Sequence, residues 1–143
     1  MSNTPAPYGV GDASYQAAGG IEGLHRLVDD FYRIMDEHPE AAIIRQMHPE
    51  DLSMARDKLA CFLSGWLGGP KLFREKYGPI AIPSFHAQWK IGEADSAAWL
   101  LCMKEAIARQ PYAPDFAAYL LKALHVPADR VVVASAQRHG TPL

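Results

Sequence analysis

Residues 84–91 read Ser-Phe-His-Ala-Gln-Trp-Lys-Ile, and residues 98–103 read Ala-Trp-Leu-Leu-Cys-Met. The first stretch places His86 on a connector between Pro83 and Gly92, and the second places Trp99 thirteen residues later on the apolar pattern of a helix. Proline fixes the backbone ahead of the histidine, and glycine permits a turn after it. This arrangement suits a group held between helices, with one imidazole ligand and one indole N–H donor beside it.

Outside these stretches, apolar residues recur at spacings of three and four, which predicts an all-α fold. The expected long helices cover residues 21–36, 49–66, 93–109 and 116–124. A short first helix is expected with Ser14 as its cap, a further turn of helix over residues 41–44, and a loop with one or two single-turn helices over residues 70–92. The pattern contains no internal repeat.

Three prolines and one β-branched run determine where we expect these helices to start and end. His38-Pro39 predicts the end of the first long helix, because proline disfavours helical backbone at the preceding residue. Acidic residues after Pro49 favour a helix start there. Pro127 is expected to kink or end the last helix. Residues 131–133 are three valines, which we interpret as a helical continuation because no second strong strand is available for pairing.

The chain has 143 residues, which predicts one domain over 1–143, with a flexible N-terminal extension at 1–13 and a flexible tail at 136–143. The net charge of −2 and the lack of a basic run argue against nucleic acid or a membrane surface as partner. No apolar run reaches the roughly 20 residues that span a bilayer, and the N-terminus lacks a secretory signal pattern. Cys61 and Cys102 are interpreted as reduced, buried thiols, which predicts a cytoplasmic protein.

The sequence lacks the motifs that are typical of zinc sites and phosphate-binding loops. The six histidines are never three or four residues apart, so a helical zinc clamp cannot be drawn, and neither CxxC nor HExxH occurs. Gly68-Gly69 ends a helix rather than opening one after a strand, which argues against a phosphate loop. Taken singly, His86 would more often be an ordinary loop or core histidine, and Tyr32 and Trp99 would usually be core aromatics.

Taken together, the motifs resemble the group II truncated haemoglobins over residues 15–124. The matching stretches are Gly19-Gly20, residues 27–32 (LVDDFY), 48–52 (HPEDL), 62–63 (FL), 67–70 (LGGP), His86 with Ile91, and 99–103 (WLLCM). The resemblance implies a two-on-two helical sandwich around haem b. The Gly68-Gly69 pair then lets the chain turn tightly into the loop that carries the histidine.

The resemblance also implies roles for individual residues. His86 is the expected proximal ligand to iron, with its other ring nitrogen donating to a carbonyl or water. On the other side of the haem, Tyr32, Trp99 and His48 are expected to hydrogen-bond the bound gas, and Ala55 stands where ordinary globins have a distal histidine. The expected remaining haem contacts are Phe31, Leu59, Phe62, Leu63, Phe73, Tyr77 and Trp89.

The chain departs from the family pattern on the proximal side. Many members carry an arginine immediately before the ligand histidine, and this chain has Phe85. The usual Gly-His-Pro ahead of that segment is Gly78-Pro79-Ile80 here. Lys58 is therefore the first candidate for holding a haem propionate, followed by Tyr77 and Arg74.

The implied function is binding of oxygen, carbon monoxide or nitric oxide at the haem iron. A hydrogen bond to a partly charged ligand contributes roughly 1.5–3 kcal/mol, so two or three donors would release oxygen too slowly for simple transport. Oxygen binding or storage, sensing or redox detoxification are the favoured roles. The alternatives are a haem enzyme that turns over nitric oxide or peroxide with an unidentified reductase, and a cofactor-free helical interaction domain.

Overall fold

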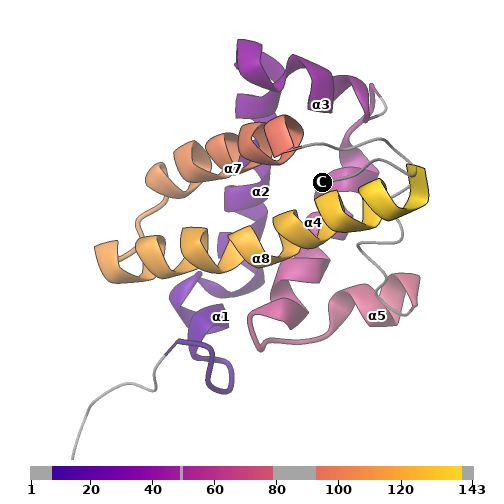
Figure 1. Cartoon of the computed structure of the whole chain (residues 1–143). Coiled ribbons are helices and arrows are strands. Elements are labelled where there is room, and N and C mark those ends of the chain that lie inside the picture. Colours follow the sequence, from indigo (N-terminus) through magenta and orange to yellow (C-terminus); the bar gives the residue numbers. More distant parts are fainter. Residues whose placement is uncertain (1–7, 49, 79–92, 140–143) are drawn as a thin grey trace, which may run out of the picture.

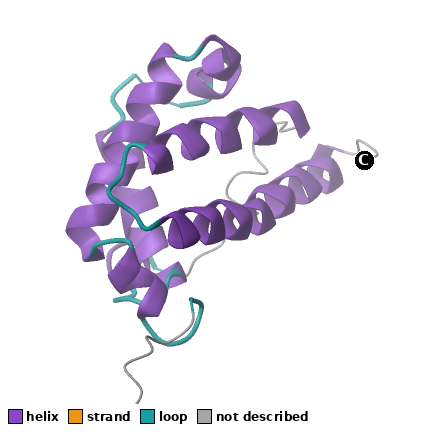
Figure 2. Ribbon diagram, turned by 90° about the vertical axis from the view of Figure 1, so that its left-hand side faces the viewer, coloured by secondary structure: helices purple, strands orange, loops and turns teal. Residues whose placement is uncertain are grey.

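The computed structural model describes residues 8–48, 50–78 and 93–139. Beyond Arg130, Val132 is the one residue whose side chain is described. These residues form helices and loops only (Figure 2). In chain order the elements are α1 (Ala13–Ala17), α2 (Gly20–Glu37), the 3₁₀ turn η1 (Pro39–Ala41), α3 (Ala42–Gln46), α4 (Ser53–Trp66), α5 (Leu72–Tyr77), α7 (Glu93–Ala108) and α8 (Pro114–His139). The predicted all-α class is confirmed.

Helix α2 is the centre of the fold. It packs against α4 on one side and against α7 on the other, and α7 in turn packs against α8 (Figure 1). The fold is therefore built from two helix pairs that meet where α2 contacts α7. Leu24, Leu27 and Phe31 of α2 are completely buried, and full burial of each such side chain contributes roughly 1.5–3 kcal/mol.

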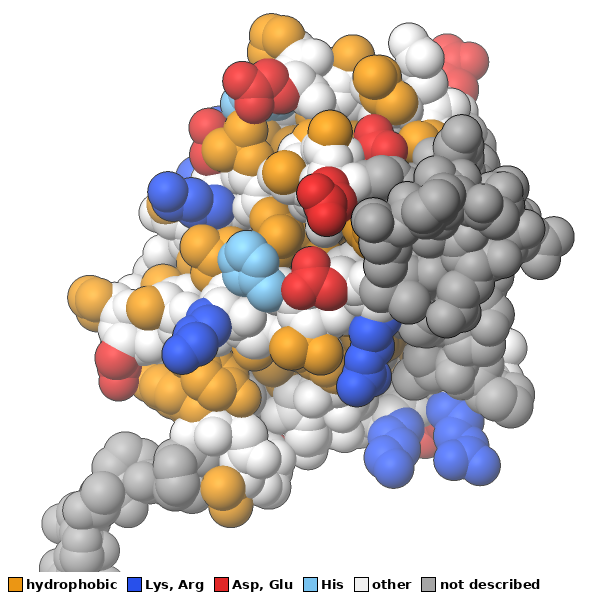
Figure 3. Space-filling model, in the orientation of Figure 1, with side chains coloured by type: hydrophobic (Ala, Val, Ile, Leu, Met, Phe, Trp, Pro, Cys, Tyr) orange, Lys and Arg blue, Asp and Glu red, His pale blue; other side chains and the backbone are white. Residues whose placement is uncertain are grey.

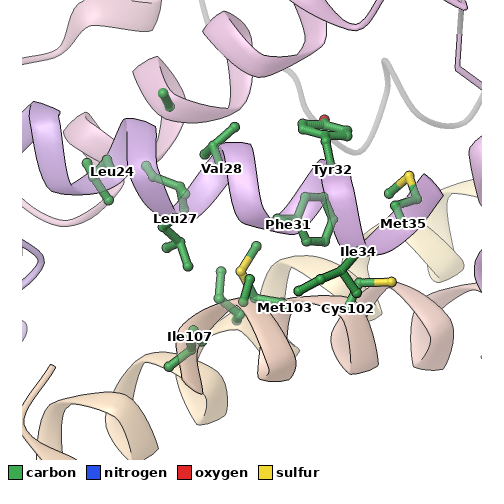
Figure 4. Packing of buried hydrophobic residues seen from close by; sticks show 14 of the residues in the cluster. Leu24, Leu27, Val28, Phe31, Tyr32, Ile34, Met35, Cys102, Met103 and Ile107 are labelled. Atoms are coloured by element: carbon green, nitrogen blue, oxygen red, sulfur yellow. The ribbon is translucent and has the colours of Figure 1, made fainter. Parts of the chain in front are cut away.

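Two neighbouring residues of α2 serve different sides of the molecule. Figure 4 shows Phe31 pointing toward α7, where Met103 and Cys102 lie, and Tyr32 pointing to the opposite side of α2. Consecutive residues of a helix are about 100° apart, so one buried helix can complete the core and present a polar group elsewhere. Tyr32 is nevertheless only 5% exposed.

Glycines allow α1 and α2 to cross closely. Gly19 and Gly20 have φ values of +89° and +68°, which L side chains rarely adopt. At Gly23, inside α2, a Cβ atom would lie 2.0 Å from the carbonyl oxygen of Ala18. The backbone of α2 therefore approaches the end of α1 as closely as the absence of a side chain permits.

Two expected helix starts are wrong, for local reasons. Ser14 lies inside α1 rather than capping it, and its Oγ accepts a hydrogen bond from the backbone N–H of Gly9 at 2.9 Å. Helix α4 begins at Ser53 rather than at Pro49, and the Asp51 carboxylate accepts hydrogen bonds from the Ser53 N–H and hydroxyl at 2.9 and 2.7 Å. Short polar side chains compete for backbone groups in this way and hold the chain outside the helix.

Helix α8 does not end at Pro127 but continues to His139. An internal proline removes one helical hydrogen bond and costs about 3 kcal/mol. Leu120, Leu124 and Val132, on both sides of the proline, are buried, and this packing offsets the cost. The helical interpretation of the three valines is confirmed, and the helix includes residues 136–139 of the segment predicted to be a tail.

The N-terminal residues from Tyr8 onward contact α8. The Tyr8 ring lies 5.2 Å from the Phe116 ring, and its hydroxyl donates to the Asp115 carboxylate at 3.0 Å. Cys61 and Cys102 are both free and buried, as predicted. No helix within the described residues is long and apolar enough to cross a membrane.

Candidate functional site

Four rings from three parts of the chain lie together beside α2; we call Phe31, Tyr32, His48 and Trp99 the aromatic cluster. The Phe31 ring centroid lies 4.9 Å from that of Tyr32 and 5.3 Å from that of Trp99, on α7. The Tyr32 centroid lies 5.7 Å from that of His48, which follows α3. All three contacts are edge-to-face, a favourable aromatic geometry. Tyr32 and His48 are thus in direct ring contact, and Trp99 is linked to Tyr32 through the Phe31 ring.

Tyr32 supplies a buried phenol to the aromatic cluster. Burial raises its pKa well above the ordinary value, and the positive charge of Arg56 offsets only part of this effect. The hydroxyl therefore keeps its proton at physiological pH, which makes it a hydrogen-bond donor.

The ring of His48 is held by a backbone carbonyl. Its Nδ1 lies 2.9 Å from the carbonyl oxygen of Ile44, at the preceding turn of α3. A carbonyl can only accept, so Nδ1 carries the proton, and in the neutral ring Nε2 is an acceptor. Burial lowers the pKa of His48, the Ile44 hydrogen bond raises it, and the Arg45 charge lowers it again. Neutral His48 is thus an acceptor at Nε2, and it becomes the expected donor only when protonated.

Arg56 is a charged residue of this region that the sequence reasoning missed. Its Nε lies 3.9 Å from Asp29 Oδ1 but is buried and makes no hydrogen bond with any described residue. Its charge reaches Tyr32. Arg56 stands in a charged run with Asp57 and Lys58, so nothing in the sequence sets it apart.

Helices α4 and α5 are joined through one carboxylate. Asp57 accepts hydrogen bonds from the Tyr77 hydroxyl and from Lys76 Nζ, the latter at 3.2 Å. The Tyr77 hydrogen bond is the main cause that lowers the pKa of Asp57, and it raises the pKa of Tyr77 to about 12. Lys58 Nζ lies 5.3 Å from the centre of the Tyr77 ring. Two of the residues predicted to lie near propionates therefore lie together.

Basic side chains gather at the α5 end of the molecule. Figure 3 shows them at the lower right, where Figure 1 places α5. Lys71, Arg74 and Lys76 of this region are exposed. A carboxylate ligand at this end would therefore meet positive charge.

The predicted apolar contacts on α4 and α5 are only partly covered. Leu59 and Phe62 are half-buried against the core, as is Ala55, whereas Leu63 is fully buried. The Phe73 ring is tilted against that of Tyr77, with 5.2 Å between the centroids, and Phe73 is half-buried too. Large apolar side chains left half-exposed beside a buried phenol fit a flat apolar group that would complete their burial.

The predicted ligand His86 and the predicted contact Trp89 lie outside the described residues, as does Phe85. Among the predicted residues that the structure does describe, Leu63 belongs to the core, and Arg74 lies exposed on α5.

Comparison with known proteins identifies the family. Residues 13–131 match the family model for bacterial-like globins. A group 2 truncated hemoglobin, YjbI of Bacillus subtilis, is 36% identical over 96 residues, which are 67% of this chain and 70% of that protein. This chain belongs to the group II truncated haemoglobins.

Solved structures of truncated haemoglobins agree with this fold. The group II 2-on-2 hemoglobin of Agrobacterium tumefaciens is 30% identical, with a TM-score of 0.79 over 91% of this chain and 97% of that one. The truncated oxygen-avid haemoglobin of Bacillus subtilis is 32% identical, with a TM-score of 0.76 over 83% of this chain and 98% of that one. The α2–α4 and α7–α8 pairs therefore form the predicted two-on-two sandwich.

Membership of this family implies a haem iron cofactor and diatomic ligands. The residues present fit that group on two counts. Half-buried apolar side chains on α4 and α7 suit the faces of a porphyrin, and the basic residues of α4 and α5 suit its carboxylates.

Proposed function

We propose that this truncated haemoglobin binds haem through His86 and retains a diatomic gas, oxygen above all, against hydrogen-bond donors from Tyr32 and Trp99. The observation that carries the proposal is the aromatic cluster, in which Phe31 contacts both donor-bearing residues at ring distances of 4.9 and 5.3 Å. Haem, when bound, supplies the iron at which such gases bind.

The residues of the chain divide the remaining work. Tyr32 carries its phenol proton at neutral pH, as any tyrosine does, and burial raises its pKa further; its hydroxyl can therefore donate a hydrogen bond to a partly negative ligand. Trp99 has an indole N–H, which can only donate. Ala55, half-buried on α4, leaves room for the ligand, and Lys58 with Arg56 supplies positive charge for the propionates.

Slow release of oxygen is the functional consequence. Each hydrogen bond to a partly charged acceptor contributes roughly 1.5–3 kcal/mol, which is about tenfold or more in dissociation rate. The oxygen-avid description of the Bacillus subtilis structure supports the same behaviour here. A protein that retains oxygen in this way suits storage, sensing or redox chemistry better than transport.

The test is to delete each donor while keeping its ring. We expect Trp99→Phe and Tyr32→Phe each to raise the oxygen dissociation rate about tenfold, measured by stopped-flow displacement with carbon monoxide. Tyr112→Phe is the matched control, because the Tyr112 hydroxyl is buried outside the aromatic cluster and has no hydrogen-bond partner among the described residues. If Tyr32→Phe and Trp99→Phe both release oxygen at the wild-type rate, these residues only pack in the core, and the proposal is overturned.

A further inference from the structure

Arg45 joins three acceptors around the residues that carry His48. Its Nε contacts the Asp36 carboxylate near the end of α2. From the same guanidinium, Nη1 donates to the His48 carbonyl at 3.5 Å, and Nη2 donates to the Glu50 carbonyl at 3.1 Å. The planar fork of an arginine can satisfy several acceptors at fixed angles, which a lysine cannot do.

These contacts connect the chain on both sides of the His48 ring. Ile44, whose carbonyl accepts the hydrogen bond from His48 Nδ1–H, is the residue before Arg45. The two carbonyls that accept from Arg45 belong to His48 and Glu50. Asp36 belongs to the same helix as Tyr32, the ring that His48 contacts. Arg45 therefore links the backbone at His48 and Glu50 to α2, the helix that carries Tyr32.

The structure assigns to Arg45 the role of a positioning residue: by joining Asp36 to the carbonyls of His48 and Glu50, it holds the His48 ring on the Ile44 carbonyl and keeps Nε2 as an acceptor. The assignment extends the proposed function, because it determines whether His48 donates to the bound ligand or accepts from a donor beside it. If the hydrogen bond to the Ile44 carbonyl is lost, a neutral His48 can carry its proton on Nε2 and act as a donor there.

Among the described residues, Tyr32 of α2 contacts the His48 ring, and the charge of Arg45 on α3 lowers its pKa. Asp36 of α2 pairs with Arg45, and Arg56 of α4 acts on Tyr32. Loss of the Arg45 charge and better access of water to the ring favour the protonated form, whereas loss of the Ile44 hydrogen bond disfavours it. The tautomer of the neutral ring therefore tests the role of Arg45 more directly than the titration midpoint does.

Histidine tautomers can be measured directly by long-range ¹H–¹⁵N NMR of the diamagnetic carbon monoxide complex, with the His48 signals assigned from His48→Gln. In the wild-type protein at neutral pH we expect the Nδ1–H form alone. Arg45→Met should show both tautomers. Arg45→Lys keeps the charge but loses the planar fork, so it should also show both tautomers.

Arg33→Met is the matched control, because Arg33 is exposed and pairs with Asp30 of its own helix at 3.7 Å. Asp36→Asn is a second route to the same effect if Arg45→Met does not fold. A lower melting temperature with an unchanged His48 tautomer in Arg45→Met and Arg45→Lys would show a merely structural role and would overturn the assignment. Failure of the chain to take up haem would contradict the proposed function instead, and the tautomer would then be measured on the haem-free protein.

Discussion

At the residue scale, the state of His48 follows from where its ring is buried. The ring lies between the Ile44 carbonyl and the Tyr32 ring, and burial is the main cause that lowers its pKa from the ordinary value of 6.5. The residue type alone predicts a group that titrates near neutral pH. The hydrogen bond that determines the tautomer depends on the path of α3, and one sequence does not reveal it.

The lowered pKa of His48 predicts a dependence of stability on pH. In the unfolded chain the ring takes a proton near pH 6.5, whereas the folded ring does so only at lower pH. The unfolded state thus binds more protons as the pH falls below 6.5, and stability is lost over that window until the folded ring also protonates. One such group changes the free energy of unfolding by at most about 1.4 kcal/mol per pH unit.

Urea unfolding at several pH values below 7 measures this dependence. His48→Gln, which does not titrate, should lose less stability between pH 6.5 and 5 than the wild-type protein does. His25→Gln, at an exposed position of α2, is the control and should follow the wild-type curve. Parallel curves for His48→Gln and wild type would show that the ring titrates alike in both states.

At the scale of elements, the crossing of α1 and α2 depends on Gly23. A Cβ atom there would meet the Ala18 carbonyl oxygen at 2.0 Å, and real Cβ atoms do not approach backbone so closely. Gly23→Ala must therefore move one helix, and we expect a loss of about 2 kcal/mol or more, in the range of overpacked sites. Gly65→Ala in α4 is the matched control, because the nearest atom would lie at 3.4 Å.

Thermal unfolding of the two glycine variants separates packing from helix propensity. Alanine is favoured over glycine inside a helix by up to about 1 kcal/mol, so Gly65→Ala should leave the melting temperature equal or higher. Gly23→Ala should lower it clearly. Equal melting temperatures for the two variants would mean that α2 does not approach α1 as the structure has it.

The periodicity of apolar residues predicted α2 and α7 closely, because their buried positions recur at helical spacing. The predicted segment 21–36 became α2 (Gly20–Glu37), and 93–109 became α7 (Glu93–Ala108). The errors came where local and tertiary effects compete. Asp51 binds the backbone ahead of α4 and delays that helix, and burial of leucines around Pro127 carries α8 past the proline.

At the scale of the whole molecule, the family and its cofactor followed from motifs, whereas the supporting contacts did not. Tyr32, His48 and Trp99 were predicted as site residues because their types and spacing match a known pattern. Arg45 and Arg56 were missed, because their importance depends on which carbonyls, carboxylates and rings the fold places beside them. Their distances come from helices α2, α3 and α4 together, and no spacing in the sequence records them.

The central claim is that this chain is a haem protein ligated by His86, and the absorption spectrum of the purified protein tests it most directly. We predict that the wild-type protein carries haem, that His86→Gly loses most of it, and that added imidazole restores a five-coordinate ferrous spectrum. A colourless wild-type protein after haem-supplemented expression, or a wild-type haem spectrum in His86→Gly, would contradict the claim.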